Sequence, residues 1–186
     1  MKKRTASSTD AVNAGARANE AFAAIPAPLV QTSTYTFRDS AEVIALTNGT
    51  HERPDREEYG RYGNPTCRDV EVRLAALEQT EDAVLFSSGM AAVTTAILAH
   101  VKQGHHVVLF SDCYRMTREF VTGTLAHFGV GATLVPPGDI AAMKSALRPE
   151  TRMVISEAPS NPYNRCVDLA ALAAACKPIR DVRTMV

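Results

Sequence analysis

The chain has 186 residues, 46% of them hydrophobic, which is enough for one domain with a substantial core, with room for a second small lobe. Twenty Lys and Arg balance twenty Asp and Glu, and no basic block follows the initial MKKR, so the charge pattern argues against a nucleic-acid partner. MKKR has no apolar segment behind it, and the nearly apolar run from Ala91 to Val101 is too short to span a bilayer. We therefore expect a cytoplasmic protein that binds no membrane.

The thiols and imidazoles give no pattern typical of a metal site. Four cysteines are scattered without a CxxC pair or a His at ligand spacing. His105 and His106 are adjacent at the start of an expected strand, so their side chains point to opposite faces. We expect structural thiols, no metal, and no functional role for this histidine pair.

The composition changes after residue 65. Residues 1–65 are irregular, rich in Ala, Pro and charged residues, and are typical of an extended N-terminal arm. From residue 66 on, helical and strand patterns alternate in one domain, 66–186. In chain order we expect helix 69–79, strand 83–88, helix 89–101, strand 106–110, helix 115–129, strand 132–136, helix 139–147, strand 152–157, helix 168–177 and strand 181–186.

This alternation predicts an α/β fold. Short Val, Ile and Leu-rich strands separated by helices are typical of βαβ units, which form a mostly parallel sheet covered by helices on both faces. Ligands of such sheets bind beyond the carboxyl ends of the strands. The loops at which we expect a site are therefore 87–90, 111–115 and 157–162.

The loop with Ser87, Ser88 and Gly89 leads from an expected strand into a helix. Free N–H groups and the positive end of the helix dipole make this junction a candidate anion site. Gly89 has no side chain to keep an anion away from the amides. The alternative is that Ser88 simply caps the helix.

Two further loops supply an aromatic ring and polar groups. Tyr114 lies after the expected strand 106–110, where its ring could stack on a planar ligand, although a half-buried packing role is the alternative. Glu157 and Asn161 follow the next strand along, in a segment whose prolines also suit a rigid turn.

Tyr59 and Arg61 lie two residues apart in the arm, so in extended backbone their side chains project to the same side. Arginine suits bidentate phosphate recognition. Because the pair precedes the sheet, we expect it to serve a neighbouring subunit's site. An ordinary exposed loop is the alternative.

Taken together, these loops resemble those of the pyridoxal-phosphate enzymes of cysteine and methionine metabolism, the transsulfuration group. The segments PLVQTSTYTF, EYGRYGNPT, SSGMAA, SDCYRMTREF and EAPSNPYNRCVDL occur in family order between about residues 27 and 169. The fourth and fifth of these, with DCYRMTR followed by SNPYNRCVD, are most similar to the cystathionine γ-synthase branch. The resemblance implies the aspartate-aminotransferase-like, type I fold, homodimers or homotetramers, and small amino-acid substrates.

The resemblance also implies roles for individual residues. Ser88 and the amides of Gly89 and Met90 would bind the cofactor phosphate, which Tyr59 and Arg61 would reach from a partner subunit.

Tyr114 would stack on the pyridine ring and could relay a proton, and Asn161 would lie near the phenolic oxygen. Glu157 matches a cofactor-site position of open role. Arg118 could meet a substrate carboxylate.

Two groups that this chemistry requires have no counterpart in the sequence. The cofactor needs a Schiff-base lysine and a carboxylate at its ring nitrogen. Lys102, Lys144 and Lys177 fall at expected helix ends, and Asp181 opens a strand, so all lie at the wrong edge of the sheet. The remaining lysines, Lys2 and Lys3, precede the arm's first motif.

We therefore expect the N-terminal half of a larger enzyme, inactive alone. The complete enzyme would replace the γ-substituent of an O-acylhomoserine with cysteine. One alternative is a cystathionine or methionine γ-lyase. Another, of a different class, is a non-catalytic remnant that binds phosphate or pyridoxal phosphate, or an assembly subunit.

Overall fold

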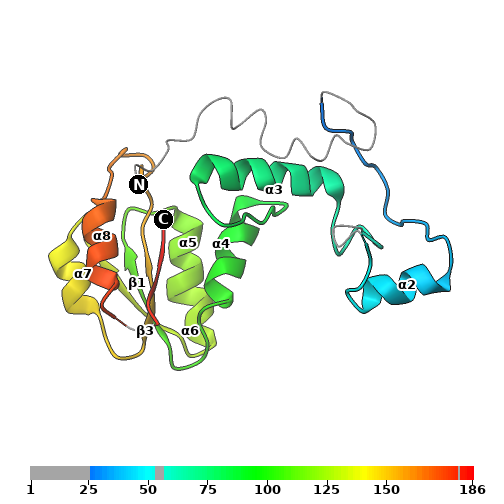
Figure 1. Ribbon diagram of the computed structural model, residues 1–186. Coiled ribbons are helices and arrows are strands. Elements are labelled where there is room, and N and C mark those ends of the chain that lie inside the picture. The colour runs from blue at the N-terminus through cyan, green and yellow to red at the C-terminus, as the bar shows by residue number, and fades with distance from the viewer. Residues whose placement is uncertain (1–25, 53–56, 180) are drawn as a thin grey trace. The chain divides into compact units, whose positions relative to one another are not determined.

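The computed structural model describes residues 26–52, 57–179 and 181–186, which belong to two compact units, Met1–Leu85 and Phe86–Val186 (Figure 1). The boundary between the units lies later in the chain than the change in composition after residue 65. Lys2 and Lys3 lie outside the described residues. Within the described ranges, no helix is long and apolar enough to cross a membrane.

The first unit contains two helices in its described part, α2 (Ser40–Thr47) and α3 (Pro65–Glu78). Helix α3 was expected, but α2 was not. Asp39 caps α2 by accepting a hydrogen bond from the Glu42 N–H at 2.9 Å, and the Glu42 carboxylate accepts one from the Arg38 N–H at 2.6 Å. This reciprocal pattern is close to a capping box, and the acidic pair three residues apart is the sequence signal for it.

The second unit is built on a parallel sheet, as expected. Its strands are β1 (His106–Phe110), β2 (Gly131–Val135), β3 (Thr151–Ile155) and β4 (Arg183–Met185). Their order across the sheet is β2-β1-β3-β4, and every pair is parallel. The carboxyl ends of these strands therefore lie at one edge.

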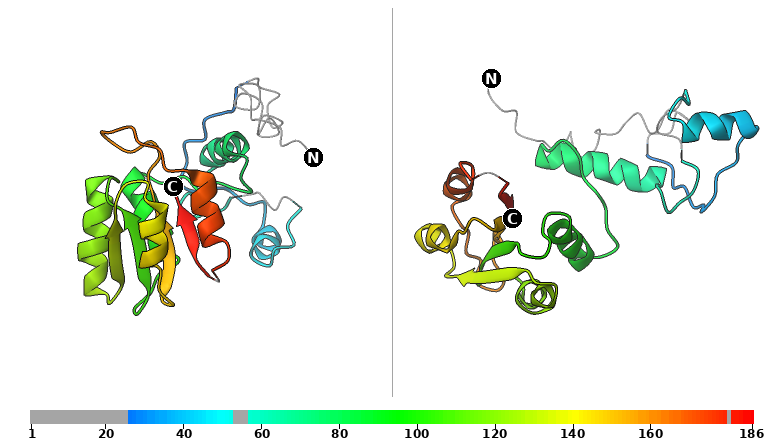
Figure 2. Two further views of the ribbon diagram at one scale, coloured as in Figure 1. Left: turned by 90° about the vertical axis from the view of Figure 1, so that its left-hand side faces the viewer. Right: turned by 90° about the horizontal axis from the view of Figure 1, so that it is seen from below.

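Helices cover both faces of this sheet (Figures 1 and 2). They are α4 (Gly89–Leu98), α5 (Arg115–Glu119), the π-helical turn η2 (Phe120–Thr124), α6 (Leu125–His127), α7 (Ile140–Ala146) and α8 (Leu169–Cys176). The expected helix 115–129 is thus one run with a π-helical middle.

The strand β1 lies at the centre of two cores. Val107 and Leu109 pack with α4 and the α5–α6 run on one face. Val108 and Phe110 pack with α7 and α8 on the other face. Because successive strand residues point to opposite faces, a strand between two helical layers is apolar throughout, and all of β1 is buried.

The expected strand 83–88 does not form. Residues 82–86 have no strand pairing, and the side chains of Val84 and Leu85 are 71% and 45% exposed. The Leu85 N–H instead donates to the Glu71 carboxylate at 2.8 Å. A strand needs a neighbour for its N–H and C=O groups, and the described residues place none beside this segment.

Candidate functional site

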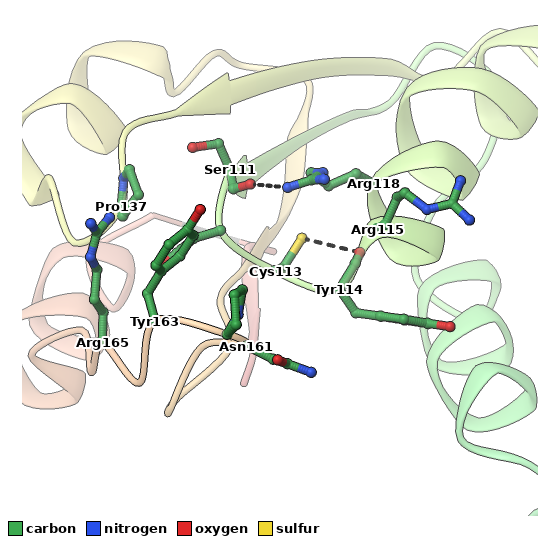
Figure 3. A pocket seen from close by; sticks show the side chains of 11 residues that line it. Ser111, Cys113, Tyr114, Arg115, Arg118, Pro137, Asn161, Tyr163 and Arg165 are labelled. Atoms are coloured by element: carbon green, nitrogen blue, oxygen red, sulfur yellow. Dashed lines mark hydrogen bonds between the residues drawn. The ribbon is translucent and has the colours of Figure 1, made fainter.

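The connections of the sheet reverse direction between β1 and β3. These strands are neighbours, yet β1 continues into the α5–α6 run on one face and β3 leads to α8 on the other. In open α/β sheets such a switch point forms a ligand crevice beyond the carboxyl ends of the strands. A pocket of about 460 Å³ lies here (Figure 3). It is lined by Ser111, Asp112, Cys113, Tyr114, Arg115, Arg118, Pro137, Asn161, Pro162, Tyr163 and Arg165.

The loop after β1 is held at three points. The Ser111 N–H donates to the Val135 carbonyl at 2.9 Å, and the Arg118 guanidinium donates to the Ser111 carbonyl, the bond drawn in Figure 3. The Tyr114 N–H donates to the Glu157 carboxylate at 2.7 Å. Arg118, for which we expected a substrate carboxylate, therefore has a backbone partner in this structure.

Tyr114 stands at the N-cap of α5 and makes no side-chain cap bond. Its side chain is half exposed and extends away from Tyr163 in Figure 3. Part of the ring is therefore accessible to a ligand.

The start of α4 keeps free amide groups, as its sequence predicts. The Ser88 hydroxyl accepts a hydrogen bond from the Ala91 N–H at 3.1 Å, so the capping role is confirmed. The N–H groups of Gly89 and Met90 have no acceptor within the described part of the chain. A Cβ built on Gly89 would meet no atom within 4 Å, so the space beside these amides is open.

One contact joins the starts of α4 and α5. The Thr117 hydroxyl donates to the Met90 sulfur at 3.8 Å, and Thr117 is 6% exposed. Tyr114 lies one turn before Thr117. The contact therefore places the open amides and the exposed ring at the same edge of the second unit.

Asn161 lies in a tightly folded loop after β3. The peptide bonds Ala158–Pro159 and Asn161–Pro162 are cis. The buried Ser160 exchanges hydrogen bonds with Arg165, from its N–H to the Arg165 carbonyl at 2.9 Å and from the Arg165 N–H to its hydroxyl at 3.2 Å. These hydrogen bonds close the loop into a turn, and Asn161 lines the pocket.

Tyr59 and Arg61 lie in the first unit with their side chains in contact, although residues 60–62 form a turn and not the extended backbone from which this was expected. The Arg61 guanidinium carbon is 5.0 Å from the centre of the Tyr59 ring and 5.6 Å from that of Tyr62, within cation–π range. The Gly60 N–H donates to the Ser33 carbonyl at 2.8 Å, which fixes the backbone between the pair.

The last part of the motif YGNPT builds a helix start. Asn64 caps α3 by accepting from the Thr66 N–H at 2.8 Å, with Pro65 at the first helical position. The Asn64 amide donates to the Val30 carbonyl at 3.0 Å. This part of the motif holds the segment around Val30 against α3.

Cys113 lines the pocket, and its side chain is buried. Burial raises the pKa of its thiol to about 11, although the nearby Arg118 opposes the shift, so the thiol is protonated near neutral pH.

Among the described residues, no group of three potential ligands could hold a metal ion.

The described lysines lie away from the carboxyl edge of the sheet. Lys102 follows α4, Lys144 is in the last turn of α7 and Lys177 caps the end of α8. Asp181 precedes β4. All four are therefore on the side from which the chain enters the strands.

Some residues of the site were not found from the sequence. Tyr163 and Arg165 line the pocket, with the guanidinium carbon 4.9 Å from the ring centre. Their position in a loop after a strand was the available signal. Thr117 could have been noticed from its spacing of three from Tyr114, which places both on one side of a helix.

The fold is an α/β domain with a pocket at the switch point of its parallel sheet. The chain belongs to the family of Cys/Met metabolism PLP-dependent enzymes, whose model matches residues 8–186. The family depends on pyridoxal phosphate (PLP).

Two curated relatives and one solved structure illustrate the relationship. Cystathionine γ-synthase 1 of Nicotiana tabacum, a chloroplastic protein, is 39% identical over 169 residues, which are 89% of this chain and 31% of the relative. L-methionine γ-lyase of Porphyromonas gingivalis is 38% identical over 190 residues, 100% of this chain and 47% of the relative. The crystal structure of metB from Corynebacterium glutamicum superposes with a TM-score of 0.83 and 27% sequence identity. The match covers 95% of this chain and 43% of the metB chain. The chain thus spans less than half the length of each.

Proposed function

We propose that this chain supplies the phosphate-binding and ring-stacking part of a transsulfuration enzyme of the cystathionine γ-synthase type. The observation that carries the proposal is the juxtaposition at the Met90–Thr117 contact. The amides at the start of α4, which have no acceptor among the described residues, and the exposed Tyr114 ring belong to neighbouring helix starts.

The residues present fit the phosphate and the ring of the cofactor. Anions bind at helix N-termini because free N–H groups and the helix dipole converge there. The open space at Gly89 lets a phosphate approach the amides of Gly89 and Met90. When bound, PLP acts as an electron sink that stabilises carbanionic character on an amino-acid substrate.

The roles of the other site residues follow from their positions. Ser88 orders the first turn of α4, and Tyr114 offers its ring to one face of the cofactor. Asn161, which lines the same pocket, offers a side-chain amide for the cofactor's phenolic oxygen. Arg118 orders the loop before Tyr114 through the Ser111 carbonyl.

Tyr59 and Arg61 are proposed to reach the phosphate in a neighbouring copy of the chain. Their stacked arrangement offers a phenolic hydroxyl and a guanidinium from one side of the arm. This proposal makes the active form a homo-oligomer. Sedimentation of the chain with and without PLP tests it, and a strictly monomeric chain that binds the cofactor normally would contradict it.

The reaction proposed for the whole enzyme is replacement of the γ-substituent of an O-acylhomoserine by cysteine. The similarity to the tobacco cystathionine γ-synthase supports it, whereas the similarity to the methionine γ-lyase supports a γ-elimination. We propose that the described lysines form no Schiff base with the cofactor, because they lie away from the carboxyl edge. Borohydride reduction of the chain with PLP should therefore leave Lys102, Lys144 and Lys177 unmodified.

Competition between PLP and inorganic phosphate tests the proposed site. A cofactor site should bind PLP more tightly than phosphate, since the ring adds stacking on Tyr114, and Tyr114→Ala should remove this preference. Phe128→Ala is the matched control, because this aromatic ring is also exposed but does not line the pocket. Equal affinities in the unsubstituted chain would favour the rival function, a module that binds phosphate alone.

A further inference from the structure

A charged hydrogen bond joins the two loops at the switch point. The Glu157 carboxylate, at the end of β3, accepts from the backbone N–H of Tyr114, after β1, at 2.7 Å. The two residues are 43 positions apart in the sequence. Among the described residues, the Tyr114 N–H donates to no other acceptor. The Glu157 carboxylate is therefore the group that holds this N–H in place.

The bond acts on the residue that starts α5. Tyr114 is the N-cap, with φ −49° and ψ 133°, and its own side chain makes no cap bond. In a capping box, a carboxylate within the same helix accepts from the N–H of the N-cap residue. Here the carboxylate comes from another loop, so the start of α5 is fixed to the end of β3.

Fixing the backbone of Tyr114 also limits the direction of its side chain. The Cα–Cβ bond is set by the backbone on both sides of the residue, and rotamers are restricted by φ and ψ. On one side, the Arg118 guanidinium holds the Ser111 carbonyl. On the other side, Glu157 holds the N–H of Tyr114 itself.

We propose that Glu157 is a positioning residue, which sets the Tyr114 ring at the angle needed to stack on the cofactor. Glu157 acts through the backbone N–H of Tyr114 and does not touch the cofactor. This inference rests on the proposed function for the role of the ring. The tether itself does not depend on that function.

Amide hydrogen exchange of Tyr114, measured by NMR without PLP, tests the tether directly. The Tyr114 amide should be protected in the unsubstituted chain and in Glu157→Gln, whose amide oxygen still accepts a hydrogen bond. It should lose protection in Glu157→Ala. Glu150→Ala is the matched control, because Glu150 is an exposed carboxylate just before the opposite end of the same strand. An unprotected Tyr114 amide in the unsubstituted chain would overturn the inference.

Ligand affinities then separate positioning from a general structural effect. Glu157→Ala should weaken PLP binding about tenfold, because the released Tyr114 backbone has to be ordered again when the ring stacks, and Glu157→Gln should keep most of the affinity. The affinity for inorganic phosphate should stay the same, because the phosphate amides belong to α4. An equal loss for PLP and phosphate would overturn the positioning role.

The double variant Glu157→Ala/Tyr114→Ala should bind PLP no more weakly than Tyr114→Ala alone, because Glu157 acts only through that ring. An additive loss would contradict the inference. If the unsubstituted chain bound PLP no better than phosphate, the proposed function and the role of the ring would both fail. The amide exchange would still decide whether Glu157 fixes the start of α5.

Discussion

The hydroxyl of Thr117 donates a hydrogen bond to the sulfur of Met90, and this contact places the first turns of α5 and α4 side by side. Each turn contributes a different kind of group. The first N–H groups of α4 have no acceptor among the residues that the structure describes, and the residue before α5, Tyr114, has an exposed aromatic ring. The site can therefore be tested one group at a time.

Gly89→Ala should separate ligand binding from stability. The added Cβ has room, and φ at Gly89 is not in the left-handed region. The free energy of unfolding should therefore stay the same or rise by up to about 1 kcal/mol. The same methyl group would occupy the space through which an anion reaches the amides. We expect at least a tenfold loss of PLP and phosphate affinity in titrations.

Gly123→Ala is the matched control for this variant. Gly123 lies in η2, and a Cβ there also meets no atom within 4 Å. This variant should show the same small effect on stability and full ligand affinity. Unchanged affinity in Gly89→Ala as well would refute the proposed phosphate site.

Ser88→Ala should destabilise the chain. Its hydroxyl accepts from the Ala91 N–H, and loss of such a cap costs about 1 kcal/mol of folding free energy. Urea unfolding followed by circular dichroism measures the change. The adjacent Ser87→Ala is the control, because Ser87 is exposed and makes no cap bond to α4; equal destabilisation by both variants would contradict the capping role.

His106 should make stability depend on pH. The ring is 2% exposed, and its Nδ1 and Nε2 lie 2.9 Å from the hydroxyls of Thr151 and Thr133. Burial lowers the pKa of His106, and the charge of Arg148 lowers it further. The pKa of His106 in the folded chain is therefore below its value of about 6.5 in the unfolded chain. The neutral ring stabilises the folded state fully above about pH 6.5, and this stabilisation is lost as the pH falls through the folded pKa.

The free energy of unfolding should therefore fall more steeply below about pH 6.5 in the unsubstituted chain than in His106→Gln, which does not titrate. His100→Gln, at an exposed histidine, should keep the steep fall. Urea titrations at several pH values measure the slopes. Identical slopes in all three chains would rule out His106 as the source.

The cysteines should react with iodoacetamide in two groups. Cys67 and Cys166 are exposed, whereas Cys113 and Cys176 are buried. Burial raises the pKa of both buried thiols, that of Cys113 to about 11, so little thiolate is present at pH 8. Peptide mass spectrometry should find early alkylation at the exposed pair, and rapid labelling of Cys113 would show that its loop opens.

Much of the second unit could be predicted because its signals are local. The apolar run of β1, the alternation with helices and the serine before α4 each depend on neighbours within a few residues. We expected one edge of the sheet to carry Tyr114, Glu157 and Asn161. This expectation needed only that the strands are parallel. Helix α2 was missed, although the capping pair Asp39 and Glu42 was a local signal as well.

What the sequence by itself determined was the α/β class, the start of α4 and the edge of the sheet at which the loops meet. Only the tertiary structure decided that residues 83–88 form no strand, because a strand exists only where another segment pairs with its backbone. It also decided that Arg118 binds the Ser111 carbonyl and that Glu157 binds the Tyr114 N–H. Such contacts join groups that are far apart in the sequence and that only the fold brings together. Each side chain has several possible partners, and the packing around it, which no local pattern encodes, decides which partner it binds.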